Sequence, residues 1–245
     1  MYSKEKSEIL FSEKALFNIK VPYKLIETSQ TDEKKPLIVY LHGFNDHIES
    51  FLKTCKPFLD RIEAYHLFIQ APYPLYDRSH KKKVEEWGRA WYLYDGDQEQ
   101  FLNSLAKTSE LIDEVLTTLE NKVSVERLCV LGYSMGGYLA GYYALTRYHL
   151  VNDLIVAGAR IKTEVLNENW GLIKDLQVLA IHGKGDNKVD YKPQRTEIVR
   201  LSKNGINANF KLINQKHIFN VAYIKEACDW LVEKGYSRNK YALKH

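Results

Sequence analysis

The sequence predicts an α/β fold, a three-layer α/β/α sandwich built on a mostly parallel central sheet of about eight strands. Short runs of consecutive apolar residues, such as PLIVYL at 36–41, are typical of strands that are buried on both faces. Stretches with helical spacing of apolar residues alternate with these runs from residue 36 to residue 235. Such alternation indicates right-handed crossovers that place helices on both faces of the sheet.

The limits of the elements come from the apolar runs and from proline and glycine. Residues 16–27 alternate apolar and polar side chains around Pro22, which predicts one or two edge strands because proline is tolerated at an edge. Residues 75–97 form an irregular segment that begins with charge and ends with aromatic residues. The other predicted strands span 36–41, 66–71, 127–132, 153–157, 177–181 and 209–213. The predicted helices span 48–59, about 97–120, 135–147, 191–203 and 220–234.

Length and composition favour one soluble domain. The 245 residues contain no internal repeat, low-complexity tract or linker, so we expect residues 1–245 to form a single domain. A charged N-terminal extension, 1–14, and a basic C-terminal tail, 236–245, flank it. The extension lacks the apolar stretch of a signal peptide, and no apolar run is long enough to cross a bilayer. We therefore expect no stable membrane insertion.

Charge and cysteine usage narrow the functional classes. The net charge of +4 is mild and scattered, without the clustered basic face of a nucleic-acid-binding protein. Cys55, Cys129 and Cys228 lie far apart in apolar patterns, with no ligand spacing of a zinc site. They are expected to be buried thiols in a reducing compartment, which predicts a cytoplasmic protein. The sequence specifies no oligomeric state.

One motif carries a specific chemistry. The run LCVLGYSMGG at 128–137 contains the pattern G-x-S-x-G, in which a strand, a tight turn and a helix would expose Ser134 at the carboxyl end of the strand. Gly132 and Gly136 flank the serine, since a Cβ at either position would crowd the strand and helix packed there. The pattern predicts a serine nucleophile, provided that the chain supplies its partners.

Three other strand ends supply candidate partners. The sequence His42-Gly43-Phe44 follows the strand at 36–41, Asp186 follows the strand at 177–181, and His217 follows the last strand. The carboxyl ends of parallel strands meet at one edge of a sheet, so these groups are expected to lie together. A serine needs a base and an orienting carboxylate, and the order Ser134, Asp186, His217 provides both.

Four motifs together resemble the α/β-hydrolase superfamily. They are GYSMG at 132–136, LHGFND at 41–46, HGKGD at 182–186 and QKHIF at 215–219, and the likeness covers roughly residues 20–235. The chain is similar to the small serine esterases of the phospholipase/carboxylesterase and dienelactone-hydrolase-like families. Dienelactone hydrolases proper carry cysteine where this chain has Ser134, so the resemblance favours a serine esterase. The filling Lys184-Gly185 is unusual for the H-G-x-x-D motif.

The resemblance implies acyl transfer to water through an acyl-enzyme intermediate. It places the oxyanion hole at the backbone N–H groups of Phe44 and Met135, and it implies neither a metal nor an organic cofactor. The segment at 160–175, where related folds often insert a lid, is short, which favours small or medium ester substrates. The candidate walls of the substrate pocket are Trp87, Trp91, Tyr133 and Phe219.

Several alternatives remain open in the sequence. Asp153 and Asp190 compete with Asp186 for the role of the acid, and His42 and His182 are expected to be structural. The same triad would serve thioester hydrolysis, a serine peptidase or an acyltransferase. A non-catalytic binding protein on the same fold is a further alternative, because fold does not fix function.

Overall fold

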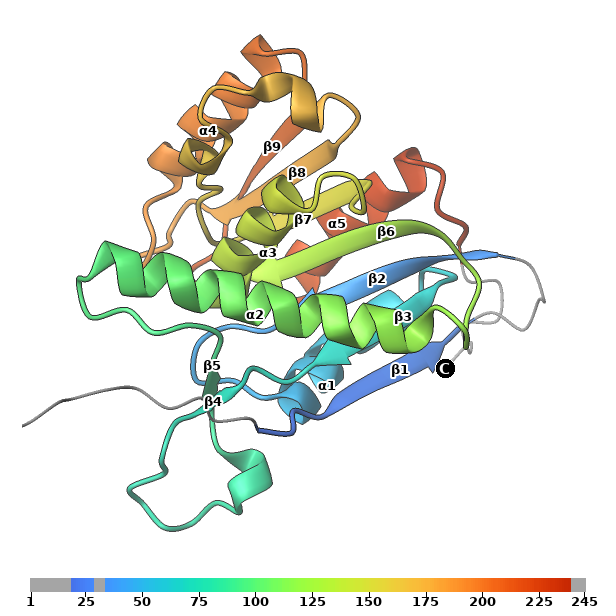
Figure 1. Ribbon diagram of the computed structural model, residues 1–245. Coiled ribbons are helices and arrows are strands. Elements are labelled where there is room, and N and C mark those ends of the chain that lie inside the picture. The colour runs from blue at the N-terminus through green and yellow to red at the C-terminus, as the bar shows by residue number, and fades with distance from the viewer. Residues whose placement is uncertain (1–18, 29–33, 239–245) are drawn as a thin grey trace, which may run out of the picture.

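The structure, a computed structural model, describes residues 19–28 and 34–238 (Figure 1). The predicted extension at 1–14 lies outside these residues. The strands are β1 (Tyr23–Glu27), β2 (Lys35–Leu41), β3 (Tyr65–Ile69), β4 (Tyr73–Pro74), β5 (Arg89–Ala90), β6 (Val125–Tyr133), β7 (Asp153–Ala157), β8 (Gln177–Gly183) and β9 (Asn207–Ile213). The helices are α1 (Ile48–Leu59), α2 (Gln98–Leu119), α3 (Met135–Thr146), α4 (Tyr191–Lys203) and α5 (Val221–Glu233). Single 3-10 turns occur at η1 (Val84–Glu86), η2 (Thr163–Leu166) and η3 (Trp170–Ile173).

A mostly parallel sheet of seven strands forms the centre, which confirms the predicted fold class. Its order is β1-β3-β2-β6-β7-β8-β9, and within this sheet, as far as the structure describes it, only the β1–β3 pairing is antiparallel. The prediction of about eight strands was one too many. Residues 16–27 supply one described strand, β1, which begins directly after Pro22, and the short strands β4 and β5 pair with each other outside this sheet.

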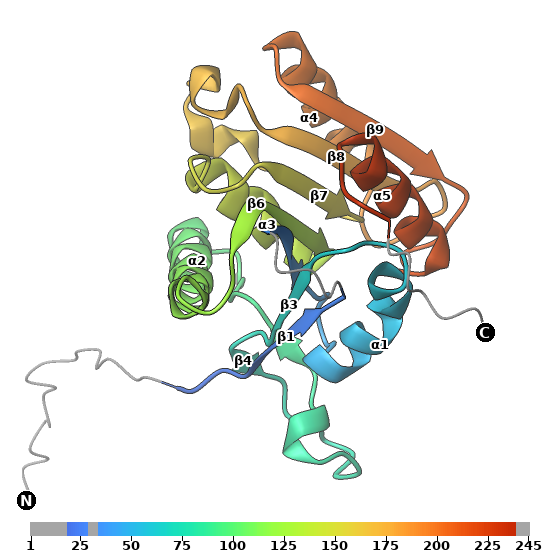
Figure 2. The ribbon, with the colours of Figure 1, turned by 90° about the vertical axis from the view of Figure 1, so that its right-hand side faces the viewer.

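Helices cover both faces of the sheet, as Figure 2 shows with α2 and α3 on one side and α1 and α5 on the other. The buried side chains of α2, α3 and α4 share one core with one face of the sheet, and those of α1 and α5 share a second core with the other face. Every residue of β2 is buried, and its side chains alternate between the two cores. The uninterrupted apolar run in the sequence thus reflects burial on both faces.

The strand order reverses between β2 and β6, and this reversal places the functional edge. From β2 the chain moves outward to β3, and it then returns through α2 to β6 on the other side of β2. Leu41 at the end of β2 pairs with Gly132 near the end of β6. The loops that leave two neighbouring strands at such a reversal point diverge, and they leave a crevice at the carboxyl edge.

At the opposite end of the sheet, an ion pair and a hydrogen bond join β6, β7 and the segment after α5. The Arg127 guanidinium binds both carboxylate oxygens of the buried Asp153 at 2.8 and 2.9 Å, and the Tyr236 hydroxyl donates to the same carboxylate at 2.7 Å. Tyr236 is itself buried, and Ser237 accepts a backbone bond from Glu63. The packed structure therefore extends three residues, 236–238, into the predicted basic tail.

The first part of the predicted irregular segment, residues 75–88, projects from the body of the molecule and is called the projecting segment below. It leaves after β4, carries the turn η1 and returns as β5, and it forms the lobe at the bottom of Figure 1. No helix among residues 19–28 and 34–238 is both long and apolar enough to cross a membrane.

Candidate active site

Ser134 sits at the sharp turn between β6 and α3. Its φ of 50° and ψ of −117° lie outside the ordinary regions for a residue with a side chain. The backbone packs too closely here for side chains beside the serine. A Cβ at Gly132 would come 2.1 Å from the carbonyl oxygen of Gly136, and one at Gly136 would come 2.2 Å from the carbonyl oxygen of Leu41. The two glycines thus permit the turn that exposes Ser134.

The structure brings the three predicted side chains into one hydrogen-bonded relay. Ser134 Oγ lies 2.9 Å from Nε2 of His217, and Nδ1 of His217 lies 2.6 Å from Oδ2 of Asp186. A carboxylate only accepts, so Nδ1 carries the proton and Nε2 is free to accept from the serine hydroxyl. The His217 side chain is 15% exposed, whereas the Asp186 side chain is fully buried.

His217 comes from the loop after β9 and reaches Ser134 across the end of β7. The chain turns there at Gly158, whose φ is +60°. A Cβ at Gly158 would lie 3.6 Å from the His217 ring and 3.1 Å from the Tyr133 ring. The positive φ and the close Tyr133 ring therefore favour glycine at this position, where the His217 ring packs at ordinary contact distance.

Asp186 is held as a carboxylate by the turn that carries it. Its Oδ1 atom accepts the backbone N–H groups of Lys188 and Val189 at 2.8 and 2.9 Å. Burial raises its pKa, but the bonds from Val189, His217 and Lys188 outweigh burial, so the pKa lies below its ordinary value. Asp186 therefore remains negatively charged when His217 accepts a proton.

The backbone N–H groups of Phe44 and Met135 have no hydrogen-bond partner among the described residues. Met135 is the first residue of α3, where an N–H has no partner within the helix. These are the two donors that the sequence placed in the oxyanion hole, and they come from the loops after the neighbouring strands β2 and β6.

The loop that carries Phe44 is hydrogen-bonded to the end of the projecting segment, where it rejoins the body of the molecule as β5. Asn45, with φ of 61°, donates to the carbonyl of Arg89, and Arg89 donates back to Asp46. Gly88 packs against this loop so closely that a Cβ there would lie 2.8 Å from the backbone of Asn45. Sequence reasoning missed this brace, because the two segments are more than forty positions apart.

Below this loop, His42 and Trp91 form a buried support. The amide of Ala71 donates to Nε2 of His42, so Nδ1 of His42 carries the proton and donates to the carbonyl of Gly43 at 2.8 Å. Trp91 Nε1 donates to the carbonyl of His42 at 2.7 Å. Burial lowers the pKa of His42 to about 4, which keeps the ring neutral near pH 7.

A cavity of about 200 Å³ opens beside His217. Two of the four predicted pocket residues, Tyr133 and Phe219, line it. Sequence reasoning did not identify the others, which come from the loop after β2, from α1 and from the position after His217; they are Asp46, Phe51, Thr54 and Ile218. The helical spacing of Phe51 signalled only a core position.

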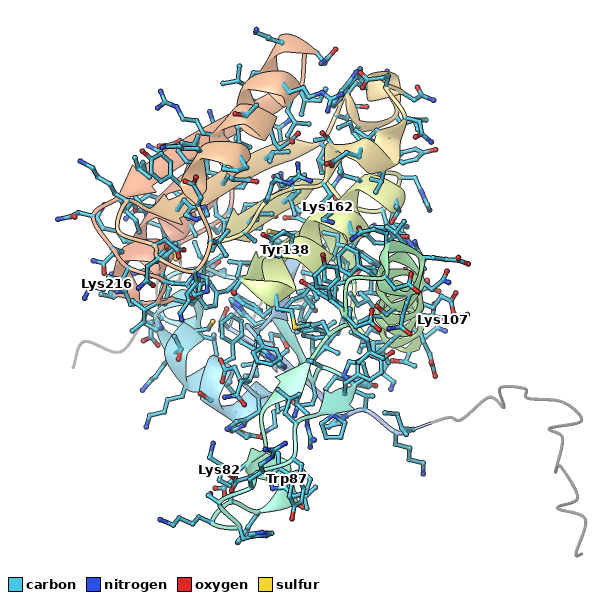
Figure 3. All side chains as sticks on the ribbon, turned by 90° about the vertical axis from the view of Figure 1, so that its left-hand side faces the viewer. Lys82, Trp87, Lys107, Tyr138, Lys162 and Lys216 are labelled. Atoms are coloured by element: carbon cyan, nitrogen blue, oxygen red, sulfur yellow. The ribbon has the colours of Figure 1, made fainter. Side chains whose placement is uncertain are left out.

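The structure does not bring the two predicted tryptophans to this cavity. Trp91 has no exposed surface and supports His42 from beneath. Trp87 lies on the projecting segment, which Figure 3 shows well away from Tyr138 on α3. Trp87 packs there against Tyr76, with ring centroids 5.0 Å apart.

The two alternative acids lie elsewhere. Asp153 is at the start of β7, at the opposite end of the sheet, where it binds Arg127. Asp190 caps α4 by accepting from the amide of Lys192. The described part of the chain holds no cluster of His, Cys, Asp or Glu that could bind a metal ion.

A larger cavity, of about 510 Å³, lies at the amino ends of the strands, between the C-terminal ends of α2 and α3. It is lined mostly by apolar side chains such as Leu116, Leu119 and Leu150, and it contains none of the triad residues. Of these two cavities, only the smaller is lined by a residue of the hydrogen-bonded relay, His217.

Comparison with known proteins agrees with the fold. The phospholipase/carboxylesterase family matches residues 23–231, and the chain belongs to this family. It is accordingly an esterase-type hydrolase with the α/β-hydrolase fold.

Individual relatives are distant but match over nearly their full length. An acyl-protein thioesterase 1 homolog 2 from Dictyostelium discoideum is 24% identical over 86% of this chain and 97% of its own. The crystal structure of Zea mays acyl-protein thioesterase 2 has a TM-score of 0.67 at 20% identity, and it covers 86% of this chain and 98% of its own. The Bacillus cereus carboxylesterase structure has a TM-score of 0.63 at 16% identity, and it covers 88% of this chain and 95% of its own.

Proposed function

We propose that this protein is a serine esterase that hydrolyses short carboxylic esters, with Ser134 as nucleophile, His217 as general base and Asp186 as orienting acid. The observation that carries the proposal is the relay of 2.9 and 2.6 Å that joins the three side chains. Both distances are within the range required for proton transfer through a positioned base.

The reaction follows from the positions of the protons. His217 Nε2 accepts the proton of Ser134 as Oγ attacks the ester carbonyl, and the N–H groups of Phe44 and Met135 receive the oxyanion. Asp186 stabilises the imidazolium that forms. His217 then protonates the leaving alcohol, and water repeats the sequence to release the acid.

The size and polarity of the cavity favour a short acyl or alcohol group. About 200 Å³ beside His217 is below the range typical of drug-sized ligands, and Asp46 and Thr54 make part of the wall polar. We therefore expect esters whose acyl group has about two to four carbons to be the best substrates.

Thioester hydrolysis is the second candidate. Two of the similar proteins carry the name acyl-protein thioesterase. Three exposed apolar side chains lie near the triad, on the loop after β2 and around the start of α5, and could contact a longer acyl chain outside the cavity; Phe44, Ile218 and Val221 are 59%, 54% and 61% exposed. A peptidase or acyltransferase would use the same triad, but no observation in this structure favours either.

The decisive experiment compares wild type with Ser134→Ala on p-nitrophenyl esters from acetate to decanoate. We expect Ser134→Ala to lower kcat by about 10³-fold or more, because the nucleophile is lost while the oxyanion site remains. Ser202→Ala, an exposed serine on α4, is the matched control and should retain full activity. Equal turnover by wild type and Ser134→Ala would rule out the proposal.

Two further assays separate the alternatives. A rate with S-acyl substrates that exceeds the rate with the matched oxygen esters would favour the thioesterase. Labelling of wild type but not of Ser134→Ala or His217→Ala by a fluorophosphonate would exclude a non-catalytic binding protein.

We also propose a cellular compartment and a class of partner for this protein. The three cysteines are free and buried, and burial raises the pKa of the Cys228 thiol to about 12. Such thiols are compatible with the reducing cytoplasm that we propose. Small ester substrates are the partners that the family implies.

A further inference from the structure

The Asp186 carboxylate faces one side chain that the proposed mechanism does not use. Oδ2 of Asp186, which accepts from His217, also lies 3.3 Å from Nε2 of His182. His182 is the penultimate residue of β8 and has no exposed surface. Two imidazoles therefore approach one carboxylate oxygen.

The partners of His182 determine its tautomer. Nε2 lies 3.0 Å from the carbonyl oxygen of Val189, and a carbonyl only accepts, so Nε2 carries the proton. Nδ1 is buried without a hydrogen-bond partner in the described part of the chain. Burial lowers the pKa of His182 and outweighs the opposing effects of Val189 and Asp186, so the ring is neutral near pH 7.

These contacts close a ring around the triad acid. Val189 accepts from His182 through its carbonyl and donates to Oδ1 of Asp186 through its N–H. A displacement of Val189 therefore displaces the carboxylate. On the other side, Gly185 donates to the carbonyl of Gln215, which ties the acid loop to the segment that carries His217.

We propose that His182 is a positioning residue of the triad: its Nε2–H holds the Val189 carbonyl and the facing edge of Asp186, and so keeps the carboxylate in line with Nδ1 of His217. This inference rests on the proposed esterase mechanism. His182 touches neither Ser134 nor the cavity beside His217, so it acts only through Asp186.

The N–H of His182 also has an electrostatic effect. The partial positive charge of this N–H stabilises the negative charge on Oδ2 of Asp186. Without it, His217 is the only imidazole that stabilises this charge. Loss of this N–H leaves the charge less compensated, and the protonated form of His217 becomes more favourable. The acid limb of the pH–rate profile should then move to higher pH.

The surrounding groups do not titrate in the same range. Tyr133 on β6, Tyr138 on α3 and Tyr223 on α5 are interaction partners of Asp186, and burial raises the pKa of each. The remaining neighbours come from the β8–α4 segment and the start of α4: Lys188, Asp190 and Tyr191.

The test compares His182→Leu, which removes the donor, with His182→Gln, whose amide N–H can reach the same carbonyl. We expect His182→Leu to lower kcat on p-nitrophenyl butyrate by about 10- to 100-fold with little change in KM, because a small displacement of the triad is costly. The acid limb should move up by about half a pH unit. His182→Gln should recover most of kcat.

His66→Leu is the matched control, since His66 is another fully buried histidine that binds Tyr40 and Ile62 away from the triad. It should leave the shape of the pH profile unchanged. Wild-type kcat and profile in His182→Leu would overturn the proposal. So would an equal loss in His66→Leu, or a loss that His182→Gln does not relieve.

A second readout does not depend on turnover. The ring signals of His217, identified by their loss in His217→Gln, can be titrated by proton NMR in wild type and His182→Leu. An upward shift of the midpoint supports the role of His182, and an unchanged midpoint contradicts it. If wild type cleaves no ester, the proposed function fails while this titration still decides the role of His182.

Discussion

At the scale of single residues, the site depends on a strained serine. A non-glycine residue with positive φ costs roughly 1–3 kcal/mol and persists only where its surroundings hold it. Ser134 is held by its amide, which donates to Ala157 at 2.8 Å, and by the close packing of Gly132 and Gly136. The strained backbone of Ser134 places Oγ beside His217, which is the position that the proposed nucleophile needs.

Gly132→Ala tests this packing. The new Cβ would lie 2.1 Å from the Gly136 carbonyl oxygen, so β6 or α3 must shift. We expect the free energy of unfolding to fall by about 2 kcal/mol or more, and esterase activity to fall with it. Urea denaturation followed by circular dichroism measures the first effect.

The control is Gly171→Ala, where the nearest heavy atom would be 4.0 Å away. This variant should stay within about 0.5 kcal/mol of wild type. If the two alanine variants were equally stable, the turn would not need its glycines.

The choice among the candidate acids also shows what the sequence alone could and could not resolve. Three aspartates followed apolar runs or preceded a helix, and all three were plausible acids. Asp153 proved to bind Arg127 at the far end of the sheet, and Asp190 proved to cap α4. The fit to the H-G-x-x-D motif favoured Asp186, and of the three it is Asp186 that lies 2.6 Å from Nδ1 of His217, with its carboxylate bound by the amides of the turn.

At the scale of elements, the oxyanion loop depends on a strand that contributes no catalytic group. β5 pairs with β4 and bonds to Asn45 and Asp46, so the root of the projecting segment supports the loop that carries the N–H of Phe44. Trp91, which follows β5, adds the bond to His42. The aromatic segment thus supports the site from behind.

Gly88→Ala should damage catalysis through this contact. A Cβ at Gly88 would lie 2.1 Å from the Asn45 side chain and 2.8 Å from its backbone, so the loop must move toward the crevice. We expect kcat to fall by about 10-fold or more, since one misplaced oxyanion donor is costly, while KM changes little. Steady-state kinetics on p-nitrophenyl butyrate measures both.

Gly171→Ala again serves as the control, and it should keep the wild-type kcat. An unchanged kcat in Gly88→Ala would show that the loop holds its position without β5.

At the scale of the whole molecule, buried histidines make stability depend on pH. His42 and His66 are both fully buried, and burial lowers the pKa of each to about 4 from an ordinary value of 6.5. Between these values the unfolded chain binds more protons than the folded one. The free energy of unfolding is therefore highest above pH 6.5 and falls as the pH drops toward 4.

We expect His66→Gln to reduce this slope by up to about 1.4 kcal/mol per pH unit between pH 6.5 and 4.5. Urea denaturation at several pH values measures the slope. His80→Gln, which alters an exposed histidine on the projecting segment, is the control and should keep the wild-type slope. A His66→Gln slope equal to that of wild type would mean that His66 binds its proton equally in both states.

The sequence by itself determined the class of fold and indicated the residues to which we assign catalysis. Apolar runs of strand length and amphipathic helices are local properties, and burial on both faces requires them. The glycines beside Ser134 are equally local, because the turn they permit spans only five residues. Three of the four motif-bearing strand ends supplied the side chains of the relay.

Only the tertiary structure decided the strand count, the cavity and the supports of the site. The walls of the cavity come from α1, β6 and the loops after β2 and β9, and the brace of the oxyanion loop joins segments more than forty positions apart. Trp87 and Trp91 are neighbours in sequence, yet one lies on a projecting lobe and the other in the core. Such contacts depend on which segments far apart in the sequence pack together, and no local sequence pattern records that.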